Sequence, residues 1–73
     1  MSVKKELLNG IYTKLEGERK TTAAELELFL DCLTVIPQHT DVKVEIDKYV
    51  TKMALIGEKL RVVKFLVDNY KDE

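Results

Sequence analysis

The sequence contains few of the residues that build chemical sites or interrupt regular structure. Its 73 residues include one cysteine, one histidine, one proline, three glycines and no tryptophan. A single cysteine excludes a disulfide within the chain, and one cysteine with one histidine is too few for a structural zinc site. So few glycines and prolines exclude a collagen-like or low-complexity chain. We therefore expect a protein without a metal ion or a cofactor.

Long hydrophobic runs are missing too. No segment approaches the roughly 20 apolar residues of a membrane-spanning helix, and the opening MSVKKELLNG lacks the apolar stretch of a secretory signal. We expect a cytoplasmic protein that does not bind membranes. What the chain does have is 45% apolar residues and a formal net charge of −1. That composition indicates a single folded domain over residues 1–73 rather than a disordered chain.

Apolar spacing predicts two short helices in the first half of the chain. Residues 3–16 place Val3, Leu7, Leu8, Ile11, Tyr12 and Leu15 on one helical face, and Gly17 is a suitable C-cap. A polar link follows over residues 18–21. Thr22 and Glu25 then have the spacing of a capping box. They begin a second predicted helix over 23–35, with the apolar stripe Leu26, Phe29, Leu30 and Leu33.

A longer helix is predicted over residues 41–70, after a turn at 37–40 and a cap at Thr40 or Asp41. Its apolar residues follow alternating steps of three and four, the spacing of an a/d heptad seam: Val42, Ile46, Tyr49, Met53, Ile56, Leu60, Val63, Val67 and Tyr70. Gly57 lies inside this pattern and could bend or split the helix. We prefer one continuous helix.

These elements predict an all-α fold, a small three-helix domain with two short helices packed on a long C-terminal helix. The predicted core combines the apolar stripes of all three helices: Leu7, Leu8, Ile11, Leu15, Leu26, Phe29, Leu30, Leu33, Tyr49, Met53, Ile56, Leu60 and Val63.

Catalytic chemistry finds little support in the sequence. Cys32 and His39 are the candidates for a thiol–imidazole pair, but no third group or Gly-rich loop accompanies them. The simpler interpretation is that Cys32 packs as a small apolar side chain and His39 lies in a solvated turn. We expect no enzymatic activity.

Direct recognition of DNA is also disfavoured. The second and third predicted helices resemble a helix-turn-helix in outline, and that motif places the start of its second helix against the DNA. Here that start carries Asp41, Glu45 and Asp47 against two lysines. The local charge therefore has the wrong sign for sequence-specific DNA binding.

The informative feature is an apolar excess on the long helix. With Ile46 at heptad position a, Leu55 and Val62 fall at c and Phe65 at f, on the side away from the seam. Either the two short helices cover this second line, or a protein partner does. We predict a partner-binding surface with flanking basic residues: Leu55, Lys59, Arg61, Val62 and Phe65. A homodimer through the a/d seam is the alternative interaction.

The opening Met1-Ser-Val-Lys-Lys-Glu-Leu-Leu and the overall length resemble the small phage-encoded proteins that bind host RNA polymerase and redirect it. This resemblance implies a protein of the host cytoplasm that binds RNA polymerase, inhibits initiation and promotes antitermination. It assigns no site residue.

Overall fold

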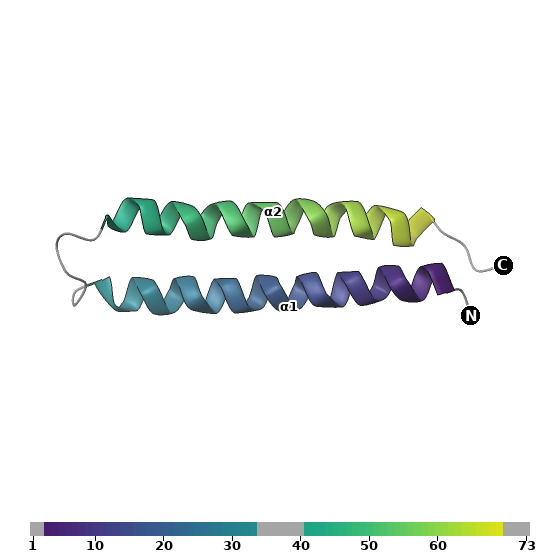
Figure 1. Ribbon diagram of the computed structural model, residues 1–73, viewed down its shortest axis with the longest axis horizontal. Helices are drawn as coiled ribbons and strands as arrows, with labels where there is room; N and C mark the ends of the chain where they lie inside the picture. The colour runs from purple at the N-terminus through teal and green to yellow at the C-terminus, as the bar shows by residue number, and fades with distance from the viewer. Residues whose placement is uncertain (1–2, 34–40, 70–73) are drawn as a thin grey trace.

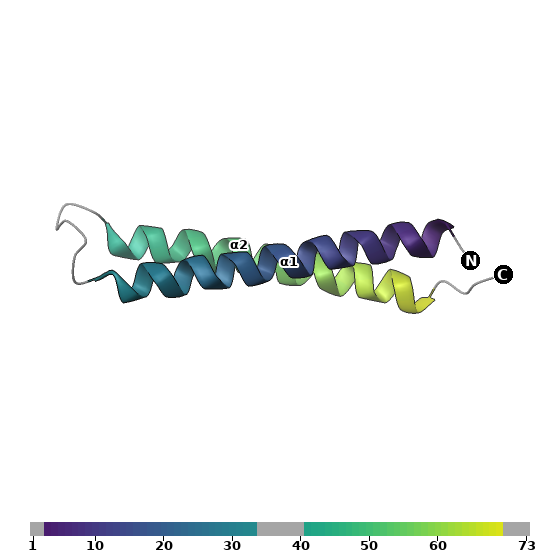
Figure 2. The ribbon, with the colours of Figure 1, turned by 90° about the horizontal axis from the view of Figure 1, so that it is seen from below.

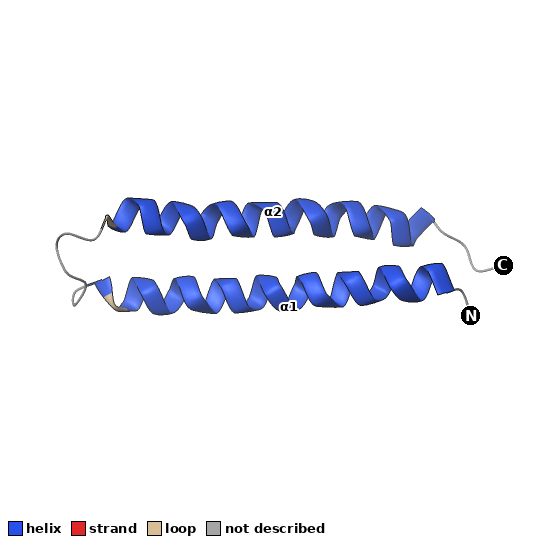
Figure 3. Cartoon of the chain, viewed as in Figure 1, coloured by secondary structure: helices blue, strands red, loops and turns tan. Residues whose placement is uncertain are grey.

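The computed structural model describes residues 3–33 and 41–69, and these form a helical hairpin (Figure 1). Helix α1 (Val3–Asp31) and helix α2 (Val42–Asn69) run antiparallel along the whole length of the molecule. Across its length the hairpin is only 15 Å by 12 Å between Cα atoms. Seen from below, the two helices cross each other at a shallow angle near their middles (Figure 2). The described part of the chain contains helix and short turns but no strand (Figure 3).

The all-α prediction is confirmed, but the three-helix arrangement is wrong, because α1 replaces the two short helices predicted over 3–16 and 23–35. Gly17 is not a C-cap: it lies inside α1, and no glycine of the described residues has a positive φ. The predicted link over 18–21 is helical, and an ion pair between Arg19 Nη2 and Glu16 Oε2, 3.0 Å apart, spans its start. The expected capping box is also wrong, because Thr22 lies buried in mid-helix.

Packing against α2 explains why α1 continues. The side chains of α1 that are buried or half-buried on the inner face follow the same steps of three and four as those of α2: Leu8, Tyr12, Leu15, Thr22, Leu26 and Phe29, with half-buried Leu33 continuing the pattern just after the helix. A glycine in mid-helix costs about 1 kcal/mol relative to alanine. Burying one aliphatic side chain contributes about 1.5–3 kcal/mol. A continuous seam therefore outweighs the local signals for a break.

Helix α2 agrees with the long helix predicted over 41–70. It starts with a side-chain cap, because Asp41 Oδ1 accepts a hydrogen bond from the Val44 backbone N–H at 3.2 Å. It continues without interruption through Gly57. The predicted turn at 37–40, the end of the second predicted helix at 34–35, and Tyr70 lie outside the described residues.

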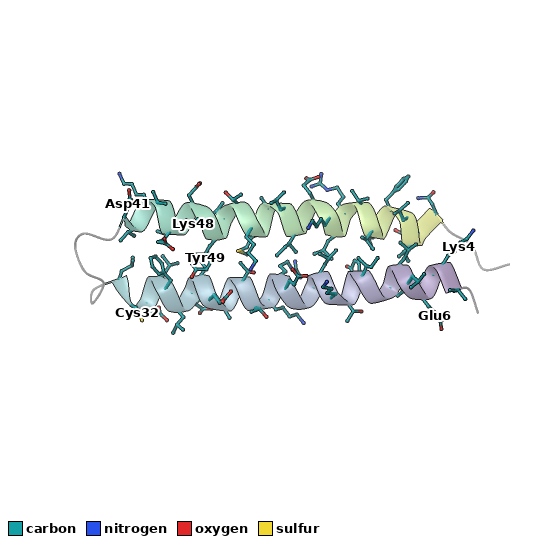
Figure 4. All side chains as sticks on the ribbon, viewed as in Figure 1. Lys4, Glu6, Cys32, Asp41, Lys48 and Tyr49 are labelled. Carbon is teal, nitrogen blue, oxygen red and sulfur yellow. The ribbon has the colours of Figure 1, made fainter. Side chains whose placement is uncertain are left out.

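The core is a single seam between the two helices. Leu15, Ile56, Leu60 and Val63 are buried, with Tyr12 and Val67 packed against them. Nearer the loop end, Tyr49 points from α2 toward α1 (Figure 4), and its ring centroid lies 5.9 Å from that of Phe29. Three residues of the predicted core are exposed instead, because no third helix covers them: Leu7, Ile11 and Leu30.

Alanine substitutions at two leucines test this division between core and surface. Leu60 is 8% exposed and Leu30 is 43% exposed. We expect Leu60→Ala to lower the free energy of unfolding by about 2–4 kcal/mol and Leu30→Ala by about 1 kcal/mol or less. Urea denaturation followed by circular dichroism measures both. Equal losses would mean that Leu30 is buried and that the chain has a third packing layer.

Gly17 distinguishes the hairpin from the three-helix arrangement. A Cβ placed on Gly17 would meet no atom within 4 Å, so alanine fits there without a clash. We expect Gly17→Ala to raise the free energy of unfolding by about 0.5–1 kcal/mol, because alanine is the better helix former. Thermal denaturation measures the change. A lower stability would identify Gly17 as a left-handed cap, where alanine is strained.

Candidate functional site

One broad side of the hairpin is hollowed into an open groove of about 500 Å³ between the helices. Both helices contribute to its walls. Apolar and charged side chains alternate along it: Ile11, Lys14, Leu15 and Glu18 from α1, and Glu58, Lys59, Val62 and Val63 from α2.

The heptad positions of the lining residues show which other residues lie on the same side of the hairpin. With the seam residues at a and d, Ile11, Glu18 and Lys59 fall at g, and Lys14 and Val62 at c. Positions recur on the same helical face every seven residues. The g and c positions of both helices therefore form one broad side, which we call the groove face. The b and e positions form the opposite side, which we call the charged face.

The groove face is the more apolar of the two. Half of the exposed large apolar side chains in the described residues lie at its g and c positions: Leu7, Ile11, Leu28, Leu55 and Val62. Two others, Leu30 and Val50, lie on the charged face, among charged residues of both signs. The remainder occupy f positions on the outer edges: Val3, Val44 and Phe65.

The structure divides the predicted partner-binding residues between separate surfaces. Lys59 and Val62 line the groove, and Leu55 lies on the same line two turns before Val62. Phe65 is exposed on the outer edge of α2, and Arg61 lies on the charged face. Arg61 Nη1 is 3.4 Å from Glu58 Oε1, so a carboxylate of its own helix partly balances its charge.

The contribution of α1 to the groove face is not predicted by the three-helix arrangement. That arrangement places Leu7 and Ile11 in the core and gives Leu28 no role. The signal was present, because the steps from Leu8 and Tyr12 to Leu26 and Phe29 continue the heptad through the predicted break. In that register Leu7 and Leu28 fall at c and Ile11 at g.

The sequence predicts no metal ion, and Cys32 and His39 are its candidates for a catalytic pair. The described residues contain no group of three or more His, Cys, Asp or Glu side chains that could hold a metal ion. Cys32 is exposed just after α1, which corrects its expected packing as a small apolar side chain. His39 lies outside the described residues. Neither α1 nor α2 is apolar enough over a sufficient length to span a membrane.

Comparison with known proteins gives no match to a family model, to a curated protein or to a solved structure. The functional argument therefore depends on the physical character of the hairpin's surfaces.

A polar group interrupts the seam itself. Thr22 is 1% exposed, and its Oγ1 has no hydrogen-bond partner within residues 3–33 and 41–69. A buried hydroxyl without a partner costs about 1–3 kcal/mol of desolvation. The seam position before Thr22 is occupied by Arg19, which is exposed. The middle of α1 therefore holds α2 less firmly than an uninterrupted apolar seam would.

Replacing the hydroxyl of Thr22 with a methyl group tests this weakness. We expect Thr22→Val to raise the free energy of unfolding by about 1–2 kcal/mol, since the shape and the β-branching are retained and the unsatisfied oxygen is lost. Thr13→Val, an exposed change on the same helix, is the control and should stay within about 0.5 kcal/mol. A loss of stability in Thr22→Val would show that the hydroxyl is satisfied.

Proposed function

We propose that this protein is a small protein–protein interaction module that acts by binding a protein partner rather than by catalysis. The observation that carries the proposal is the concentration of exposed apolar side chains on the groove face. Monomeric proteins rarely expose large contiguous apolar patches, and such patches mark interaction sites. The groove face carries leucine, isoleucine and valine side chains of two helices, with charged side chains between them.

The shape of the surface favours a helical partner. Two antiparallel helices with a groove between them accept the side chains of a further helix, as in a helical bundle. Leu55 and Val62 are two turns apart on α2, the spacing that contacts one face of a partner helix. A flat sheet or an extended peptide would use fewer of these anchors.

The charges of the groove disfavour a nucleic acid as its ligand. Lys14 and Lys59 are balanced by Glu18 and Glu58 among the lining residues. Phosphate backbones are bound by surfaces with an excess of lysine and arginine. The balanced groove therefore fits a protein surface that carries charges of both signs.

The identity of the partner is proposed from the resemblance to small phage proteins. On that basis we propose bacterial RNA polymerase as the target and transcription regulation as the role, with initiation inhibited and antitermination promoted. Self-association is the alternative. In this structure the a/d seam of α2 packs against α1 within the chain, with Leu15 against Ile56, Leu60 and Val63. A homodimer would then use another face.

Calorimetric titration of purified bacterial RNA polymerase tests the proposed target. We expect saturable binding by the unchanged protein. Val62→Asp, which places a charge on the groove face, should weaken binding at least about 30-fold, as loss of a central apolar anchor does. Val50→Asp makes the same change on the charged face of the same helix and should bind as the unchanged protein does.

Each result decides a separate part of the proposal. Absence of binding by the unchanged protein would remove RNA polymerase as the partner. Equal affinities of the unchanged protein and Val62→Asp would remove the groove face as the binding surface.

A further inference from the structure

We propose that the groove face binds a second copy of this chain, so that two hairpins form a symmetric four-helix bundle. This inference rests on the proposed interaction module and takes its alternative, self-association, as the occupant of the groove face in place of RNA polymerase. Three properties of the hairpin support it: the size of its core, the area of the groove face and the arrangement of charges along the groove.

A single hairpin leaves most of its apolar side chains without a second packing layer. Among residues 3–33 and 41–69, four apolar residues are buried, whereas five large ones are exposed on the groove face alone. Stable helical domains bury each apolar stripe against another element. Chains of about this length commonly add oligomerisation when their own core is small. Two groove faces in contact would bury the exposed leucines, isoleucine and valine of both chains.

The groove face is large enough for a small dimer interface. Helices of 29 and 28 residues are about 43 Å long at 1.5 Å per residue. The hairpin is 15 Å wide between Cα atoms, so one broad side has a footprint of about 650 Å². Standard specific interfaces take about 600–1,000 Å² from each partner. Contact along the full length of the groove face therefore falls at the lower end of that range.

The charges along the groove are self-complementary. Lys14 and Glu18 lie one helical turn apart on α1. A twofold axis passing between them, perpendicular to the helix, brings Lys14 of each chain opposite Glu18 of the other. Glu58 and Lys59 add one acid and one base to the α2 wall of the groove. Twofold interfaces require a patch that complements itself, and this acid–base alternation meets the requirement. A partner surface with charges of a single sign would be attracted by one member of each acid–base pair and repelled by the other.

Sedimentation equilibrium of the purified protein, from low micromolar to about 200 µM, tests the inference. We expect the unchanged chain to approach twice its mass of 8.4 kDa. Val62→Asp should weaken the dimer at least about 100-fold, because each interface then contains two added buried charges. Val50→Asp is the matched control and should dimerise normally. The two valines are similarly exposed, at 55% and 51%, but lie on opposite faces.

A charge exchange tests the same interface without altering its apolar surface, in case Val62→Asp loses helicity. Lys14→Glu and Glu18→Lys should each weaken the dimer about fivefold, since each creates two like-charge contacts across the twofold axis. The double variant Lys14→Glu with Glu18→Lys restores the alternation and should recover the original affinity. Failure of the double variant to recover would overturn the antiparallel contact between the two α1 helices.

The remaining outcomes separate this inference from the proposed function. A monomeric unchanged chain at about 200 µM would overturn the dimer, and groove-dependent binding to RNA polymerase would still support the interaction module. A dimer that Val50→Asp disrupts as strongly as Val62→Asp would overturn the groove face as its interface. A groove-dependent dimer without affinity for RNA polymerase would support the dimer and remove that partner.

Discussion

The structure depends on one seam of contact between two long helices. Leu15 of α1 packs with Ile56, Leu60 and Val63 of α2, and the seam extends toward the loop through the Phe29 and Tyr49 rings. A pair of helices has one line of mutual contact, so a second apolar line on either helix stays in solvent. The number of helices therefore decides which apolar residues become core and which become surface.

The sequence predicted α2 well and α1 poorly for a physical reason. On α2, the apolar steps of three and four are unbroken across Gly57, so the periodicity alone defines one helix. On α1, the next two seam positions after Gly17 are occupied by the polar residues Arg19 and Thr22. Gly17, the polar residues 18–21 and the capping-box spacing of Thr22 and Glu25 are local signals that one helix ends and another begins. The packing of Leu15 and Phe29 against α2 overrides them, and tertiary contacts of that kind are not visible in local patterns.

Only the α2 side of the candidate surface could be predicted from the sequence, because that prediction depends on the regular periodicity of α2. Leu55 and Val62 were found because α2 has more apolar residues than its seam can use. Phe65 and Arg61 were grouped with them by sequence proximity, but their heptad positions place them on other sides of α2. The contribution of α1 to the groove face could not be predicted, because the three-helix arrangement places Leu7 and Ile11 in the core. Correcting the helix count is what moves these residues to the groove face.

Two features of the side-chain distribution are unfavourable for an independent hairpin. Thr22 places an unsatisfied hydroxyl in the seam, where an aliphatic side chain would add stability. Leu7, Ile11 and Val62 place apolar surface where a charged residue would favour solubility. The first choice lowers the stability of the isolated chain, and the second favours any complex that covers the groove face. In the proposed complex, binding would therefore add to the stability of the fold, because the partner would supply contacts that the hairpin lacks.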